Sequence, residues 1–100
     1  MIVPEWRWDP LKDRLNRRRH NGLSLADGVA ALMDPLAISK PDPHPDGDRW
    51  QLVGSAAGVV TLFVVYTESP DISIEPGTGR IVSVRNASPR ERRAYENGDF

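Results

Sequence analysis

Cysteine is absent from this sequence of 100 residues. Its absence excludes disulfide bonds, thiolate catalysis and cysteine-type zinc sites, and it suits a reducing compartment, so we expect a cytoplasmic protein. Long apolar runs are also missing, because the longest, around Val59 to Tyr66, is far shorter than the roughly 20 residues that span a bilayer. The N-terminal residues lack the basic and apolar regions of a signal peptide. We therefore expect neither secretion nor a membrane partner.

Motifs for cofactors and metals are missing as well. No glycine-rich phosphate loop follows a predicted strand, and the sequence has no metal-binding run and no internal repeat. We therefore expect no cofactor and no metal site. What is present is the composition of a globular domain, with 39% hydrophobic residues, 27% charged residues and a mean hydropathy of -0.46. At this length we expect residues 1–100 to form a single domain.

Charge is unevenly distributed along the sequence, although the formal net charge is only -1. Basic residues cluster at positions 14–19 and 90–93, whereas acidic residues gather at positions 42–48. Of the 13 basic residues 11 are arginine, the side chain that forms bidentate contacts with phosphate, although a GC-rich genome would produce the same bias. The sequence therefore predicts basic patches on a nearly neutral molecule.

The N-terminal half predicts a short strand followed by a helix. Trp6 and Trp8 alternate with polar neighbours in residues 2–8, as in an edge strand. Asp9-Pro10 then supplies an N-cap acceptor and a proline at the first helical position. Leu11 and Leu15 lie one turn apart, and Asn21-Gly22 supplies the left-handed residue that ends the helix. We expect about three helical turns, with these two leucines on one face.

A second helix is predicted after Ser24, which forms a capping box with Asp27. Its apolar stripe follows the spacing i, i+4, i+7 and i+8 and consists of Leu25, Val29, Leu32 and Met33. Asp34-Pro35 ends the helix, and a further strand is predicted to begin between residues 35 and 38. Residues 40–48 then form an acidic loop punctuated by proline.

The C-terminal half changes to the period of strands. Residues 49–54 and 59–67 predict a hairpin, which residues 72–74 could prolong, and residues 80–86 predict another strand. Ser88-Pro89-Arg90-Glu91 is a capping box that opens a last helix. The predicted class is α+β, with a small antiparallel sheet, two N-terminal helices and one C-terminal helix. We expect the helices to cover one face of the sheet and to leave the other face free for a ligand.

Seven short motifs follow one another over nearly the whole chain. They are Glu5-Trp6, Arg19-His20-Asn21-Gly22, Asp34-Pro35, Asp48-Arg49-Trp50, Val65-Tyr66-Thr67-Glu68, Arg80-Ile81-Val82-Ser83-Val84-Arg85-Asn86-Ala87 and Glu91-Arg92-Arg93-Ala94-Tyr95. Their order and spacing resemble the BrnT family of type II toxins. The resemblance implies a RelE/ParE-like fold and a metal-independent endoribonuclease that cleaves RNA and inhibits translation. It also implies a BrnA-like ribbon-helix-helix antitoxin as partner, operator DNA reached only through that antitoxin, and a possible dimer of toxin–antitoxin pairs.

Metal-independent RNA cleavage uses the ribose 2′-hydroxyl as nucleophile, so the protein must move protons and stabilise a charged phosphorane. Arginine suits the second task, and we expect Arg49, Arg80 and Arg85 to meet near one phosphate on the open face of the sheet. Arg80 and Arg85 differ in strand parity, so they share a face only if a bulge or a strand end redirects one of them. Arg49 could instead cap the hairpin or pair with Asp48 or Glu68.

The remaining candidates carry two interpretations each. Glu68 is a candidate carboxylate base or an ion-pair partner that holds Arg49 or Arg80. Tyr95 could bind the scissile phosphate or a base, or could pack its ring on the sheet. His20 follows a helix C-terminus, so we expect it to bond a terminal carbonyl rather than to transfer protons.

Two other functions fit the same sequence. The chain could be a non-catalytic binding module that acts with its antitoxin as a transcriptional co-repressor, or a ParE-like gyrase poison, because a fold does not settle function. Cleavage of RNA in the presence of EDTA, co-purification with a ribbon-helix-helix protein and a gyrase supercoiling assay distinguish the three.

Overall fold

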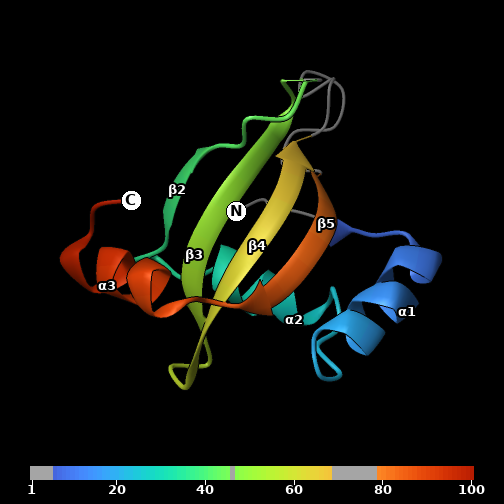
Figure 1. Ribbon diagram of the computed structural model, residues 1–100, viewed down its shortest axis with the longest axis horizontal. Helices are drawn as coiled ribbons and strands as arrows, with labels where there is room; N and C mark the ends of the chain where they lie inside the picture. Colours follow the sequence, from blue (N-terminus) through green and yellow to red (C-terminus); the bar gives the residue numbers. More distant parts are fainter. Residues whose placement is uncertain (1–5, 46, 69–78) are drawn as a thin grey trace, which may run out of the picture.

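The computed structural model describes residues 6–45, 47–68 and 79–100, of which residue 68 is described by its backbone. Within these residues the elements follow the order β1 (Trp6–Arg7), α1 (Pro10–Arg19), α2 (Asp27–Leu32), β2 (Ile38–Pro41), β3 (Arg49–Ala56), β4 (Val60–Glu68), β5 (Gly79–Asn86) and α3 (Pro89–Asn97). The strands form one sheet in the order β1-β5-β4-β3-β2 (Figure 1). The predicted α+β class is confirmed. The predicted extension by residues 72–74 lies outside the described residues.

The sheet is mixed rather than wholly antiparallel. The pairs β2–β3, β3–β4 and β4–β5 are antiparallel, as expected for consecutive strands. β1 pairs with β5 in parallel through Trp6 and Gly79 and through Arg7 and Arg80. No hairpin constrains this pair, because β1 and β5 are separated by most of the chain. The local sequence therefore could not predict whether β1 runs parallel or antiparallel to β5.

α2 packs closely on one face of the sheet. Two glycines permit the approach: a Cβ at Gly28 would lie 2.8 Å from Val84 Cγ2, and a Cβ at Gly54 would lie 2.5 Å from the Ala31 carbonyl oxygen. The main core lies at this interface and consists of Leu25, Ala31, Leu52, Leu62, Val64, Tyr66, Ile81 and Val84. Met33, predicted in the buried stripe, is 61% exposed, because α2 is short and ends at Leu32.

α3 lies on the opposite face, where a smaller core forms from Val53, Phe63 and Ala87 with Tyr95 and Phe100 packed against it (Figure 1). The expectation that all helices cover one face is therefore wrong. The reason is strand alternation, because Val53 and Phe63 point away from the main core and their apolar surface needs a cover.

α1 lies beside the edge of β5 rather than over the sheet (Figure 1). The expected caps are present: Asp9 accepts a hydrogen bond from the Leu11 N–H, and Asn21 has a left-handed φ of 54°. Leu11 and Leu15 share a face of the helix but do not pack into the core, since they are 56% and 37% exposed. The buried side chain of α1 is Asn16, which bonds to the edge of β5. No helix among the described residues is long and apolar enough to cross a membrane.

Candidate functional site

A β-bulge places the two distant arginines of β5 on the same face. Arg85 pairs with Phe63 and Ser83 with Val65, but Ile81 pairs with Tyr66, so Val82 is an extra residue in β5. Beyond the bulge Arg80 pairs with Thr67, which lies on the same face of β4 as Phe63. The bulge therefore redirects one of the two arginines, and Arg80 and Arg85 share a face.

Thr67 defines one row of side chains across this face. Arg49 of β3 and Arg80 of β5 both pair with Thr67, and Arg7 of β1 pairs with Arg80. Paired residues of neighbouring strands point to the same face, so three guanidinium groups belong to one row. Arg80 and Arg7 are exposed. Arg49 is half-buried, and its Nε lies 3.9 Å from Asp48 Oδ1.

Arg85 belongs to a second row, at Phe63. Phe63 lies four positions before Thr67 in β4, so the two rows are about 13 Å apart along the strand. The Arg85 guanidinium lies over the Phe63 ring, with Cζ 4.0 Å from the ring centroid. The same face therefore carries Arg49 and Arg80 toward one end and Arg85 toward the other, a spacing suited to an extended polyanion.

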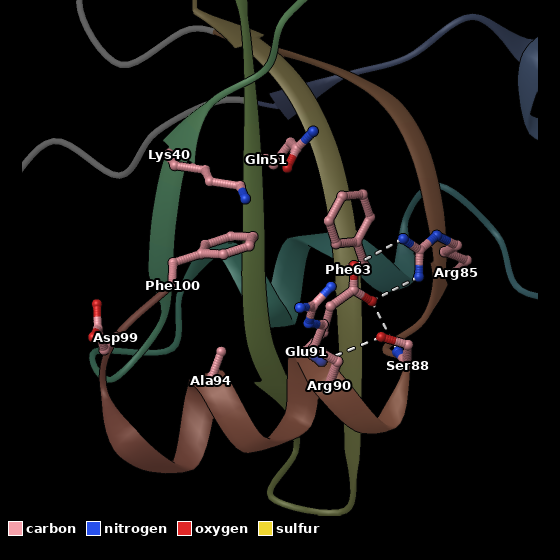
Figure 2. Close-up of a pocket in the computed structure, with 10 residues that line it drawn as sticks. All are labelled: Lys40, Gln51, Phe63, Arg85, Ser88, Arg90, Glu91, Ala94, Asp99 and Phe100. Carbon is pink, nitrogen blue, oxygen red and sulfur yellow. Dashed lines mark hydrogen bonds and ion pairs between the residues drawn. The ribbon is translucent and has the colours of Figure 1, made fainter.

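Glu91 holds Arg85 in a bidentate pair (Figure 2). Arg85 Nη1 donates to Glu91 Oε1 at 2.8 Å, and Arg85 Nη2 donates to Oε2 at 2.9 Å. Oε1 also accepts the Ser88 N–H at 2.8 Å, and the Glu91 N–H donates to Ser88 Oγ at 3.2 Å, so the predicted capping box is present. Partial burial raises the pKa of Glu91, but the hydrogen bonds and charge of Arg85 and the Ser88 bonds outweigh it, leaving the pKa below its usual value.

A groove of about 530 Å³ lies between α3 and this face of the sheet (Figure 2). Its charged lining includes Lys40, Arg85, Arg90 and Glu91. Phe100 extends from the end of α3 toward Lys40, whose Nζ lies 4.3 Å from the centre of its ring. With Asp99, which also lines it, the groove combines three cations, two carboxylates and aromatic surface, a combination that suits a phosphate with an attached base.

Tyr95 lies on α3 but does not line this groove. Its hydroxyl donates a 2.5 Å hydrogen bond to Asp34 Oδ2, and its ring packs against the smaller core. The Asp34 hydrogen bond raises the pKa of Tyr95, with desolvation adding to the effect. The geometry corresponds to the alternative in which Tyr95 packs its ring on the sheet.

The other sequence-predicted residues lie apart from the groove. Glu68 ends β4 opposite Gly79, next to the Thr67 row, and its side chain lies outside the described residues. His20 ends α1, where its backbone N–H donates to the Asn16 carbonyl. With Arg19 and Lys12 it lines a separate cavity of about 290 Å³ between α1 and β5. Among the described residues no three His, Asp or Glu side chains gather as a metal site would require.

Sequence reasoning missed Glu91, Lys40 and Arg7 as members of this face. Glu91 carried a strong local signal, but that signal was the capping box, which accounts for the residue without reference to Arg85. Lys40 pairs with Gln51 in the sheet, and Arg7 pairs with Arg80, so both were detectable only from strand pairing.

Comparisons with known proteins point in one direction. The family model described as the ribonuclease toxin BrnT of type II toxin–antitoxin systems matches residues 8–91. The 1.1 Å crystal structure of the Brucella abortus ribonuclease toxin BrnT is 24% identical, with a TM-score of 0.56 over 81% of this chain and 92% of that one. At this identity the structural likeness shows the fold. No curated protein matches the chain.

Proposed function

The chain belongs to the family of BrnT ribonuclease toxins of type II toxin–antitoxin systems, and from this premise we propose that it is an endoribonuclease that cleaves RNA without a metal ion and inhibits translation. The observation that carries the proposal is the bulge at Val82, which brings Arg80 to the face of the sheet that carries Arg49 and Arg85. Guanidinium groups can supply the positive charge that a phosphorane requires.

In the proposed reaction the ribose 2′-hydroxyl attacks the adjacent phosphorus and the 5′-oxygen of the next nucleotide leaves. Arg85, which lies in the groove, contacts the scissile phosphate and stabilises its added charge. Arg49 and Arg80, about 13 Å away along the strand, hold the RNA backbone and so position the substrate. The three arginines are given two different roles because they lie in two separate rows and do not converge on one phosphate.

Glu68 and Tyr95 complete the set of proposed site residues. Glu68 ends β4 beside the row of Arg49 and Arg80. Carboxylates pair with guanidinium groups and orient them, and this is the role proposed for Glu68. Tyr95 supports the site through Asp34, because their hydrogen bond joins α3 to the turn after α2. Both roles are positioning roles.

Cleavage of a labelled RNA in excess EDTA tests the proposal. We expect the wild-type protein to cleave under these conditions. Arg85→Ala should reduce the rate about 10²- to 10³-fold, because a charge-stabilising donor is lost. Arg49→Ala and Arg80→Ala should weaken RNA binding about tenfold each. Arg14→Ala, an exposed change on α1, is the matched control.

Three results would contradict the proposal. They are dependence of cleavage on added Mg²⁺, full activity of all three arginine variants, and inhibition of gyrase supercoiling without RNA cleavage. The last result would identify the gyrase-poison alternative instead.

Membership of a type II toxin family implies an antitoxin partner. We propose that this partner is a BrnA-like ribbon-helix-helix protein, that toxin–antitoxin pairs dimerise, and that operator DNA is contacted only through the antitoxin. The proposal rests on the family resemblance.

A further inference from the structure

The two carboxylate oxygens of Glu91 differ in the number of hydrogen bonds that they accept. Oε1 accepts hydrogen bonds from Arg85 Nη1 and from the Ser88 N–H, whereas Oε2 accepts one from Arg85 Nη2. A carboxylate oxygen can accept two hydrogen bonds. Among the residues that the structure describes, Oε2 has no second donor and therefore keeps a lone pair, on a carboxylate whose side chain is 16% exposed and lines the groove.

We infer that Glu91 is the carboxylate that accepts the proton of the ribose 2′-hydroxyl, with Arg85 beside it on the scissile phosphate. The inference rests on the proposed ribonuclease function and adds a residue to it. Its basis is geometric, because Glu91 and Arg85 are fixed side by side by two hydrogen bonds within one cationic groove. Nucleophile and phosphate are neighbours in RNA, so their two protein partners must be neighbours as well.

The proton and electron balance of the step is simple. The 2′-oxygen forms a bond to phosphorus while its proton passes to Glu91 Oε2. The bond between phosphorus and the 5′-oxygen breaks, and that oxygen takes a proton from water. The products are a 2′,3′-cyclic phosphate and a 5′-hydroxyl, and Glu91 returns its proton to solvent.

Other candidates for the proton acceptor are less well placed among the described side chains. His20 lies at the end of α1, where it lines the cavity on the edge of β5. Asp99 also lines the groove but is exposed at the far end of α3, beyond Ala94 in Figure 2. Glu91 is the groove carboxylate that is ion-paired with Arg85.

The test compares Glu91→Gln with two controls on α3. Glu91→Gln keeps the size of the side chain and an oxygen for the Ser88 N–H, but it removes the proton acceptor and with it the acceptor of the Arg85 Nη2 hydrogen bond. Ser88→Ala removes the hydroxyl of the same capping box and leaves the carboxylate. Glu96→Gln makes the same chemical change at an exposed position of α3. Cleavage rate, melting temperature and affinity for an uncleavable 2′-O-methyl RNA are measured for each.

We expect Glu91→Gln to reduce the cleavage rate about 10²- to 10⁴-fold while its affinity for 2′-O-methyl RNA stays within about threefold of wild type. The wild-type rate should fall on acidification, as the carboxylate becomes protonated, and Glu91→Gln should lack that dependence. Ser88→Ala and Glu96→Gln should keep most of the activity, although Ser88→Ala should melt earlier.

The inference is overturned if Glu91→Gln cleaves at the wild-type rate, if Ser88→Ala loses as much activity as Glu91→Gln, or if lost RNA affinity accounts for the whole effect. In each of these cases wild-type cleavage would leave the proposed function standing. Absence of cleavage by the wild-type protein itself would instead reject the proposed function, and the role of Glu91 with it.

Discussion

At the scale of single residues, Asp34 connects three parts of the molecule. Its Oδ2 accepts the Tyr95 hydroxyl of α3 and the Ser55 N–H of β3, the latter at 2.8 Å, while Oδ1 accepts the Leu36 N–H at 3.0 Å. The Tyr95 hydrogen bond lowers the pKa of Asp34, with the two backbone bonds adding to it against a smaller desolvation effect. One short side chain thus links α3 to the sheet.

These pKa shifts predict how stability depends on pH. Asp34 titrates below its ordinary value of 3.8, so its stabilising effect is complete above that pH and is lost as pH falls through the lowered pKa. Tyr95 titrates above 10.0, so its effect is complete below that pH and is lost as pH rises through the raised pKa. Asp34→Asn should lower the melting temperature at pH 7 by about 5 °C and flatten the acid dependence.

Urea unfolding of wild type and Asp34→Asn over a pH series measures this effect. Glu96→Gln, exposed on α3, is the charge-matched control. An unchanged acid dependence in Asp34→Asn would show that other carboxyl groups dominate acid unfolding.

At the scale of elements, α1 is held to the sheet by polar bonds rather than by an apolar stripe. Asn16 Nδ2 donates to the carbonyl oxygens of Leu23 and Val84 at 2.9 Å each, and Oδ1 accepts the Val84 N–H at 3.1 Å. Asp13 adds a bond from the Leu25 N–H at 2.8 Å. Asn16 therefore satisfies the backbone edge of β5 where β1 has already ended, and a bonded edge is less open to pairing with other chains.

Asn16→Ala tests this attachment. The change leaves the Val84 N–H and carbonyl and the Leu23 carbonyl without their partner, so we expect a loss of about 2–4 kcal/mol in the free energy of unfolding. Amide hydrogen exchange at Val84 should accelerate by more than the global loss of stability explains. Arg14→Ala, exposed on the same helix, should change stability by about 0.5 kcal/mol or less. Equal effects of the two changes would contradict this account of how α1 is held.

At the scale of the whole molecule, a net charge of -1 conceals a face rich in arginine and lysine. Strand pairing places Arg7, Arg49 and Arg80 in one row, and Lys40 and Arg85 line the groove farther along the same face. Acidic residues of the segment at positions 42–48 lie in the β2–β3 connection. Asp48 of that connection lies 3.9 Å from Arg49, so acidic residues border the face at one end. Strand pairing nevertheless gathers several cations on one face, which allows a nearly neutral protein to attract a polyanion.

The salt dependence of RNA binding reports on this face. The affinity for 2′-O-methyl RNA should fall as salt rises from about 50 to 200 mM, because binding releases counterions from the RNA and added salt makes that release less favourable. Arg80→Gln should reduce the slope of log affinity against log salt by about 0.7, the value for one phosphate contact on a single strand. Fluorescence anisotropy measures both slopes. An equal change in Arg14→Gln would mean that binding is not concentrated on this face.

Some of this fold and site could be predicted before any tertiary contact was known. The caps at Asp9 and Ser88 were correct because each depends on residues within one turn of the helix. The strands of residues 49–68 were found from their apolar alternation. The exposure of Leu11 and Leu15 could not be predicted, because helical spacing shows that two side chains share a face but not whether the sheet lies under that face.

The sequence by itself determined the local elements, the α+β class and the types of residue available for phosphate chemistry, because caps, alternation and composition act over a few neighbouring residues. Only the tertiary structure decided the extra residue at Val82, the side of the sheet that α3 covers and the pairing of Glu91 with Arg85. These depend on register and packing between segments distant in the chain, where a shift of one residue reverses the face of every side chain beyond it.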